Sequence, residues 1–319
     1  MATPTTYLDF EKPLSELETK IAELEQAAQG GPSIDDELSR LREKAAKQLK
    51  DIYSGLNPWQ KTQVARHPDR PHFGDYLDAL FDEWVELAGD RKYMDDHAVL
   101  GGLARFRGRP VVVIGHEKGR STEDRIKHNF GMARPEGYRK TVRLMDLAQR
   151  FGLPVIALVD TAGAFPGRGG EERGQAEALA RSIEQCLTLD TPMISVIVGE
   201  GGSGGAVALS SGNKVLMMEH AIYSVISPEG AASILFRDAK RAKDAADAMK
   251  ITAQDLEKLR IVDQIVDEPM GGAHRDPNAA ITKVGDAIEA ALAAVSDMDP
   301  EALKQQRKDR FYAIGREGL

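Results

Sequence analysis

Apolar residues recur at helical spacing along the first fifty residues of the chain, within a strongly charged background. A first stripe is formed by Leu14, Leu17, Ile21 and Leu24, and a second by Leu38, Leu41, Ala45, Leu49 and Ile52. The segment QGGPS separates the two stripes, and glycine and proline end helices. We therefore predict a helical hairpin in residues 1–56, joined to a main domain in residues 57–319. The stripes either pack on each other or dock on a partner chain.

The pattern changes from residue 99 onward to apolar runs that glycine-bearing loops interrupt. The segment GGLARFRGRPVVVIG predicts a β-hairpin with Arg107, Gly108 and Arg109 near its turn. An apolar run, a glycine-bearing loop and a helical pattern then follow one another four times; the runs are VVVIG, PVIALV, PMISVIV and KVLMMEHAIYSVIS. This alternation predicts an α/β fold with mostly parallel strands and crossover helices. The runs are apolar nearly throughout, as expected of strands that are covered on both faces.

Helical patterns dominate from residue 239 to the end of the sequence. Thr252 followed by Asp255 resembles a capping box, and Asp276 directly before Pro277 marks a second helix start. The segment RIVDQIVDEP between them is predicted to form a short strand or an extended link.

The composition narrows the class of protein. Of the 319 residues, 42% are hydrophobic and 29% are charged, as is usual for a globular protein. The net charge of −8 argues against a general binder of nucleic acid or of anionic membranes. No apolar run is long enough to span a bilayer, and MATPTTYLDFEKP lacks the apolar core of a secretory signal, so we expect a cytoplasmic enzyme or enzyme subunit. The single cysteine, Cys186, excludes an internal disulfide, and its helical context favours a buried thiol.

The candidate chemistry centres on the glycine-rich segment GEGGSGGA, residues 199–206, which we expect to enter a helix at Ala206. Gly199, Gly201 and Gly204 match the dinucleotide-binding pattern G-x-G-x-x-G, and Glu219 stands where a ribose-binding acid belongs. However, the run KVLMMEH begins only eight residues after Ala206, which leaves too little room for a full crossover helix.

The same segment matches the nucleophile-elbow pattern G-x-S-x-G around Ser203. A hydrolase further needs an acid and a histidine in chain order, and Asp263 or Asp267 followed by His274 meets that order. His274, however, lies in the polar segment GGAHRDPN, which we expect at the surface. Both side-chain patterns are therefore weak.

A third interpretation uses only the backbone. Consecutive glycines let main-chain N–H groups face a cleft, and a helix that starts there adds its dipole. A second glycine loop, DTAGAFPG at residues 160–167, ends the preceding apolar run. Loops at the same end of adjacent parallel strands converge on one crevice, which favours a site of backbone donors for an oxyanion over close packing alone.

Four segments, DTAGAFPG, EERGQAEALAR, GEGGSGGA and YSVISPEGAASILFRDA, resemble in this order the α subunit of the bacterial acetyl-CoA carboxylase carboxyltransferase. LDFEKPLSELETKI, ARHPDRPHFGDY, NFGMARPEGYRK and EPMGGAHRDP extend the resemblance over nearly the whole chain. It implies a crotonase-type ββα superhelix with an N-terminal helical hairpin and C-terminal helices. It also implies an enzyme that moves a carboxyl group from carboxybiotin, held on the biotin carboxyl carrier protein, to acetyl-CoA and forms malonyl-CoA for fatty-acid synthesis.

The resemblance further implies a shared active site. A β subunit with a zinc ribbon would carry much of the acyl-CoA site in an α2β2 assembly, and biotin carboxylase would complete the ATP-using holoenzyme. This chain is expected to hold no metal and to supply the biotin side. We expect the backbone N–H groups of Gly204 and Gly205 to hold the biotin oxyanion. The pocket would also be lined by Gly163, Ala164, Phe165, Gly201, Gly202 and Ser203.

The chain departs from the family's Asp-Thr-Pro-Gly-Ala-Tyr-Pro-Gly at Ala162 and Phe165. The tyrosine hydroxyl is lost as a hydrogen-bonding group of the pocket wall. Neither change removes a backbone donor, so the expected oxyanion site is unaffected.

Other chemistry-bearing residues have ordinary explanations. A basic patch is formed by Arg134, Tyr138, Arg139, Lys140 and Arg143, and we predict a solvated helix face rather than contact with CoA phosphates or with the carrier. Glu171 and Glu172 suit the first turn of a helix. His116 and His128 are predicted to be structural.

Two alternatives to a shared carboxyltransferase site stay open. A free-standing crotonase-like hydratase would need an acid–base pair beside the loops, for which Glu200 and Glu229 are the nearest glutamates. A scaffold that has lost catalysis but still binds the β subunit is the second alternative.

Overall fold

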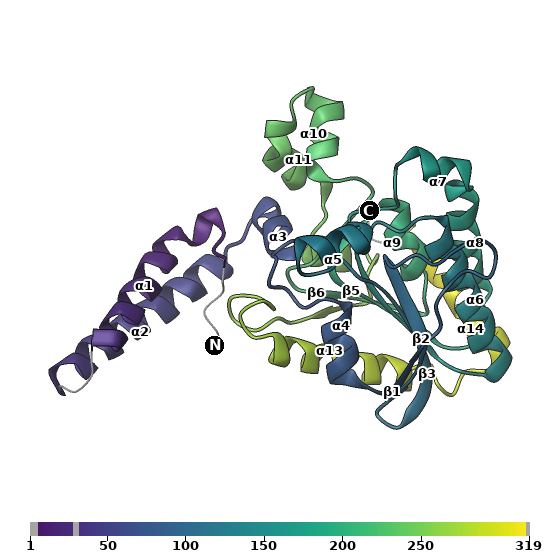
Figure 1. Cartoon of the computed structure of the whole chain (residues 1–319), viewed down its shortest axis with the longest axis horizontal. Coiled ribbons are helices and arrows are strands. Elements are labelled where there is room, and N and C mark those ends of the chain that lie inside the picture. Colours follow the sequence, from purple (N-terminus) through teal and green to yellow (C-terminus); the bar gives the residue numbers. More distant parts are fainter. Residues whose placement is uncertain (1–5, 28–31, 317–319) are drawn as a thin grey trace.

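The N-terminal hairpin extends away from the rest of the molecule in Figure 1. The computed structural model describes residues 6–27 and 32–316, and the hairpin consists of α1 (Lys12–Ala27) and α2 (Pro32–Tyr53) after a short 3-10 turn at Asp9–Glu11. Most of the predicted QGGPS turn lies outside the described residues. Leu14 and Leu49 are buried in one cluster with Val64, so the two apolar stripes pack on each other and on the adjoining helix.

One mixed sheet forms the centre of the main body. Its strands are β1 (Phe81–Glu86), β2 (Val99–Phe106), β3 (Arg109–His116), β4 (Val155–Thr161), β5 (Met193–Gly202), β6 (Lys214–Met218), β7 (Ile222–Ser224) and β8 (Gln264–Val266). The order is β1-β2-β3-β4-β5-β6-β8, with β7 also paired to β5. β2 pairs antiparallel with both β1 and β3, and the strand pairs from β3–β4 onward are parallel. The predicted parallel α/β arrangement is therefore confirmed.

The predicted β-hairpin is confirmed as β2 and β3. Phe106 pairs with Arg109, which leaves Arg107 and Gly108 as a two-residue turn, both at positive φ. The run KVLMMEHAIYSVIS, in contrast, is two short strands rather than one. β6 pairs with the first half of β5, and β7 pairs with its last residues, from Glu200 to Gly202.

Helices cover both faces of the sheet. The helices between the N-terminal helical hairpin and β5 are α3 (Pro58–Ala65), α4 (Phe73–Leu80), α5 (Thr122–Lys127), α6 (Pro135–Phe151), α7 (Arg168–Glu172) and α8 (Gln175–Thr188). Those after β5 are α9 (Ser203–Ser210), α10 (Pro228–Phe236), α11 (Ala242–Met249), α12 (Ala253–Lys258), α13 (Pro277–Ala293) and α14 (Pro300–Ala313). None of the described helices combines the length and the apolar character needed to cross a membrane.

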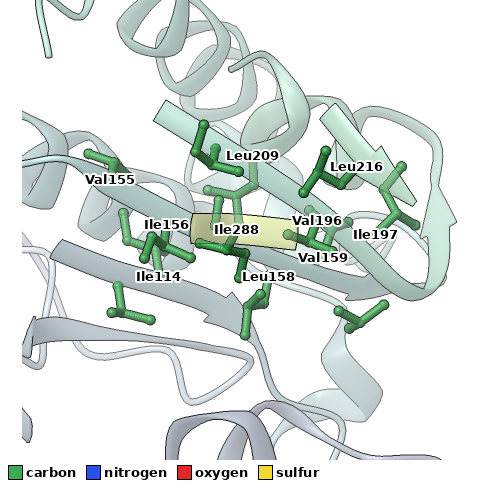
Figure 2. Packing of buried hydrophobic residues seen from close by; sticks show 14 of the residues in the cluster. Ile114, Val155, Ile156, Leu158, Val159, Val196, Ile197, Leu209, Leu216 and Ile288 are labelled. Atoms are coloured by element: carbon green, nitrogen blue, oxygen red, sulfur yellow. The ribbon is translucent and has the colours of Figure 1, made fainter. Parts of the chain in front are cut away.

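The core lies around β4 and β5, in which every residue is buried. Figure 2 shows Ile156 and Leu158 of β4 and Val196 of β5 gathered with Leu209 of α9 and Ile288 of α13. Each large aliphatic side chain buried in this way contributes roughly 1.5–3 kcal/mol. The core therefore fixes the two strands whose ends carry the glycine loops.

The predicted helix starts in the C-terminal part are confirmed. Thr252 accepts the Asp255 N–H at 3.2 Å at the start of α12, and Asp276 accepts the Ala279 N–H at 3.1 Å at the start of α13. The short strand β8 lies within the segment RIVDQIVDEP, as expected.

The helix predicted to contain Glu171 and Glu172 is divided. Both acids lie in the short α7, and α8 begins only at Gln175, because Gly174 adopts φ 80° between them. Cys186 in α8 is fully buried, and burial raises the pKa of its thiol to about 12. The prediction of a buried cysteine is confirmed.

Candidate active site

The two glycine loops meet in direct backbone contact. The loop 162–167 follows β4, and β5 runs straight into α9, with Thr161 paired to Gly201 where the strands end. A Cβ on Gly205 would lie 2.8 Å from both the Ala164 nitrogen and the Gly163 carbonyl carbon. A Cβ on Gly202 would overlap the Ala162 carbonyl. Only glycine permits this approach, so the predicted convergence of the loops is confirmed.

Helix α9 begins at Ser203, not at Ala206 as the sequence suggested. Gly204 and Gly205 therefore lie in its first turn, where backbone N–H groups have no partner within the helix. The partial positive charge of the helix N-terminus is added to theirs. Both glycines predicted to hold an oxyanion are thus at the position where a helix best binds one.

The loop after β4 has one backbone N–H that is free and one that is hydrogen-bonded within the loop. The Thr161 hydroxyl accepts the Gly163 N–H at 3.0 Å and donates to the Gly163 carbonyl at 2.9 Å. Gly163 has φ +140°, which other residues rarely adopt. The Ala164 amide, in contrast, has no hydrogen-bond partner in the described part of the chain. Ala164 rather than Gly163 therefore offers the free donor next to Gly205.

The far end of this loop is held by the residues directly before α6 and by α8. Phe165 donates its N–H to the Ala133 carbonyl at 2.9 Å. The Gln175 side chain donates to the same carbonyl at 2.8 Å and to the Phe165 carbonyl at 3.1 Å. The Phe165 ring lies under the Arg134 guanidinium, 4.9 Å away, and packs against Gly167. These contacts fix the loop backbone and point the ring toward α7.

An apolar cavity of about 420 Å³ opens beside the first turn of α9. Ser203, Gly204 and Val207 line one side of it. The remaining walls come from the β7 region and from α11 and α12: Tyr223, Ser224, Val225, Met249, Lys250, Ile251, Leu256, Leu259 and Ile261. The cavity therefore presents the N-terminus of α9 to a largely apolar ligand.

A second cavity, of about 370 Å³, has charged walls and includes Ala162 of the other glycine loop. Lys118 lies 2.6 Å from Asp160, and Arg66 lies 2.6 Å from Glu200. Asp160 also accepts the Glu200 N–H at 2.8 Å. Lys118 and Arg66 are thus each paired with an acid of this cavity, whose lining also includes Arg70 and Arg125.

Glu200 and Glu229 do not form the acid–base pair of a hydratase. The guanidinium of Arg66 binds both, at 2.6 Å and 2.7 Å. Burial alone would raise the pKa of Glu229, but the hydrogen bond and the charge of Arg66 lower it. A carboxylate held ionised by a cation is a poor proton donor at neutral pH.

The hydrolase arrangement is not assembled either, and the expectation of a surface position for His274 is wrong. His274 is buried and stacks on His67 with ring centroids 3.9 Å apart. Burial and neighbouring positive groups lower the pKa of His274 to about 2. Asp263 binds Arg310 at 2.9 Å instead of a catalytic histidine.

Three residues of metal-binding type, Glu11, His67 and His274, lie together where the hairpin joins the main body. The Glu11 carboxylate accepts from the Leu8 N–H at 2.8 Å and from the Tyr53 hydroxyl at 2.9 Å. His67 accepts the Asp69 N–H at 3.1 Å, and its other nitrogen faces the Thr6 carbonyl at 2.9 Å, whereas Nδ1 of His274 has no partner among the described residues. Arg275 also lies 3.4 Å from Glu11, so these residues form a polar cluster that ties the N-terminal hairpin to the main body.

The basic patch is not a solvated helix face, and that prediction is wrong. Tyr138 and Lys140 are fully buried in α6. Lys140 lies 2.5 Å from Asp95, and Arg139 lies 2.7 Å from Asp90. Arg139 and Lys140 thus tie α6 to the segment 90–95 through ion pairs. Of the two histidines, His116 is buried and burial lowers its pKa to about 4, as suits a structural residue.

The overall fold of the chain recurs in solved structures. Transcarboxylase 12S has a TM-score of 0.58 at 19% identity and matches 71% of this chain and 42% of its own. The Pseudomonas malonate decarboxylase hetero-tetramer in complex with coenzyme A has a TM-score of 0.57 at 16% identity and matches 72% of this chain and 94% of its own. The chain thus has the fold of the crotonase-type carboxyltransferases, as the resemblance implied.

Sequence comparison narrows the class further. Residues 7–315 match the family model for acetyl co-enzyme A carboxylase carboxyltransferase-like proteins. The acetyl-coenzyme A carboxylase carboxyl transferase subunit alpha of Caulobacter vibrioides is 65% identical over 315 residues, 98% of either chain. That of Methylobacterium nodulans is 64% identical over 313 residues, 98% of this chain and 99% of its own. The chain belongs to the family of acetyl-CoA carboxylase carboxyltransferase α subunits.

Proposed function

We propose that this chain supplies the biotin half of a shared carboxyltransferase site. In this site a carboxyl group passes from carboxybiotin, carried on the biotin carboxyl carrier protein, to acetyl-CoA and yields malonyl-CoA for fatty-acid synthesis. The observation that carries the proposal is the meeting of the unpaired Ala164 amide with the first turn of α9 at Gly204 and Gly205.

The reaction explains why backbone donors suffice. When carboxybiotin releases carbon dioxide, its ureido oxygen gains negative charge, and the ureido group can then take the α-proton of acetyl-CoA, whose carbon bonds to the carbon dioxide. The chain's task is to hold that oxygen. One hydrogen bond to a developing oxyanion is worth roughly 3 kcal/mol in the transition state. Amide donors do not titrate near neutral pH, so the site keeps its donors while protons move nearby.

Two features of the site suit a neutral ring with a charged oxygen. The walls of the cavity beside Gly204 are largely apolar, and a surrounding of low polarity strengthens the hydrogen bonds made there. Glycine at positions 202 and 205 brings the second loop close enough for its amide to act on the same oxygen. Gly201, Gly202 and Ser203 shape this approach, and Gly163 serves as the bend that exposes Ala164.

The thioester half of the site comes from a β subunit in this proposal. Val225 beside the apolar cavity is 82% exposed, and Ile234 and Leu235 of α10 are also exposed. Neighbouring large apolar side chains on a surface are typical of an interface. We propose that the β subunit covers them, carries the zinc and the acyl-CoA site, and assembles as α2β2 with the biotin carboxylase and carrier components.

The division into a hairpin, residues 1–56, and a carboxyltransferase domain, residues 57–319, is part of the same proposal. Because the apolar stripes of the hairpin are packed inward, docking on a partner would use its charged outer faces.

The test is co-expression with the β subunit and measurement of malonyl-CoA-dependent carboxylation of free biocytin, the reverse half-reaction. We expect activity in the pair and none in either chain alone. An inactive but well-formed complex would refute the proposal and favour a scaffold. Activity of this chain alone would refute the shared site.

A further inference from the structure

The hydroxyl of Tyr138 lies where the two glycine loops meet. Tyr138 belongs to α6 and is fully buried. Its oxygen is 2.9 Å from the point that a Cβ of Gly205 would occupy, and the Ala164 nitrogen is 2.8 Å from the same point. The side chain thus occupies the space that the missing Cβ of Gly205 leaves, beside the free amide of Ala164.

This hydroxyl has no hydrogen-bond partner within the described part of the chain. The other deeply buried tyrosines contrast with it: Tyr53 donates to Glu11 at 2.9 Å, and Tyr76 donates to the Met218 sulfur at 3.2 Å. Asp96, whose charge acts on Tyr138, does not bind the hydroxyl but accepts the N–H groups of Ala98 and Arg134.

An unpaired buried hydroxyl is costly, at roughly 1–3 kcal/mol. Phenylalanine would fill the same space without that cost, so the ring alone does not explain a tyrosine at this position. Burial raises the pKa of Tyr138 above its usual value, so the hydroxyl keeps its proton at working pH. What remains is an O–H dipole that can rotate freely in a region of low dielectric constant.

We propose that Tyr138 is a positioning residue of carboxyl transfer, which orients its free O–H toward the negative charge that develops on an oxygen held by the Ala164 and Gly205 amides. The inference rests on the proposed function. The hydroxyl acts from behind the backbone of Gly205 and does not touch the substrate. Its dipole lowers the energy of the charged state, and its ring holds the two loops at their separation.

The test is Tyr138→Phe in the α chain, assayed with the β subunit by carboxylation of biocytin. We expect kcat to fall about fivefold to tenfold, because the O–H dipole no longer stabilises the developing charge, with the KM for malonyl-CoA unchanged. The thermal midpoint should stay the same or rise, because the variant removes an unsatisfied polar atom. If the hydroxyl were purely structural, its removal would not lower kcat while leaving the thermal midpoint unchanged or higher.

Tyr76→Phe is the matched control, because Tyr76 is equally buried but contacts Met218 instead of the glycine loops. We expect its kcat to match that of the unsubstituted pair. A wild-type kcat in Tyr138→Phe overturns the inference and leaves the proposed function intact. A loss of kcat together with a lowered thermal midpoint also overturns it, since the hydroxyl would then be structural. An inactive unsubstituted pair refutes the proposed function and this inference with it.

Discussion

Gly205→Ala is the substitution that most directly tests the meeting of the two loops. The added methyl group would lie 2.8 Å from two backbone atoms of the loop 163–164 and 2.9 Å from the Tyr138 oxygen. Ordinary contacts between heavy atoms begin at about 3.5 Å, so the loop must retreat by roughly 0.7 Å. Two of these neighbours are backbone atoms and the third belongs to a buried ring, so none can move aside as the end of a flexible side chain could.

The expected effect on rate follows from that displacement. Complete loss of one oxyanion donor lowers kcat by about 10²- to 10³-fold, and a misplacement of about 1 Å costs about 10²-fold. We therefore expect Gly205→Ala to lower kcat about 100-fold in the reverse half-reaction with the β subunit. Crowding would also cost about 1–3 kcal/mol of stability, partly offset by the better helix propensity of alanine.

Gly204→Ala is the control in the same turn of α9. Its nearest neighbour would be the Leu179 side chain at 3.7 Å, an ordinary contact, and it gains the same helix propensity. We expect it to keep most of its activity and a thermal midpoint no lower than that of the unsubstituted chain. The reasoning fails if Gly205→Ala stays within threefold of the unsubstituted pair, or if both substitutions inactivate equally.

Three further predictions concern the framework around the site. Glu268→Gln leaves Arg70 unpaired in the interior, and we expect a loss of about 3–5 kcal/mol in chemical unfolding. Burial alone would raise the pKa of Glu268, but Arg70 lowers it to about 2. The ion pair therefore stabilises the fold fully above about pH 5, and this contribution is lost as the pH falls toward 2. A Glu268→Gln variant as stable as the parent at pH 7 would contradict the prediction. Arg275→Ala removes the ion pair to Glu18 at 2.9 Å, so amide exchange should quicken in residues 12–53 but not in β4. Cys186 should react with a thiol reagent only at the rate of unfolding, and prompt labelling of the native chain would disprove its burial.

The parts of the fold that the sequence predicted are those decided by local pattern. The stripes of α1 and α2 repeat at helical spacing, and β4 and β5 are continuous apolar runs. The capping residues Thr252 and Asp276 act on amides three residues away, so their signal is contained in a few positions. The glycine loops could be paired because parallel strands place their ends together.

The parts that it did not predict depend on partners far along the chain. Arg275 is buried because it donates to the carboxylate of Glu18, 257 positions earlier. The polar segment GGAHRDPN carries no signal of that distant partner. Lys140 is likewise buried by carbonyl groups of the 96–99 segment. The early start of α9 was missed because glycine has low helix propensity, which packing against the other loop overrides.

The sequence also could not predict whether Gly163 or Ala164 has the free backbone N–H. The two residues are adjacent in the sequence, but the Thr161 hydroxyl accepts a hydrogen bond from the Gly163 N–H and leaves the Ala164 N–H free. Side-chain capture of this kind depends on the exact turn of the loop, which the letters DTAGAFPG do not specify.

The reliance on glycine at positions 202 and 205 has a consequence for how this protein tolerates change. Most enzymes lose activity when a side chain is deleted, whereas here the damaging events are additions of atoms. Truncating side chains would not reveal these positions, and inactivating alleles should cluster as small-to-large replacements, of which glycine to alanine is the smallest. Only a substitution to proline removes a main-chain N–H, so few single replacements would delete the hydrogen bonds of an inhibitor anchored on these amides.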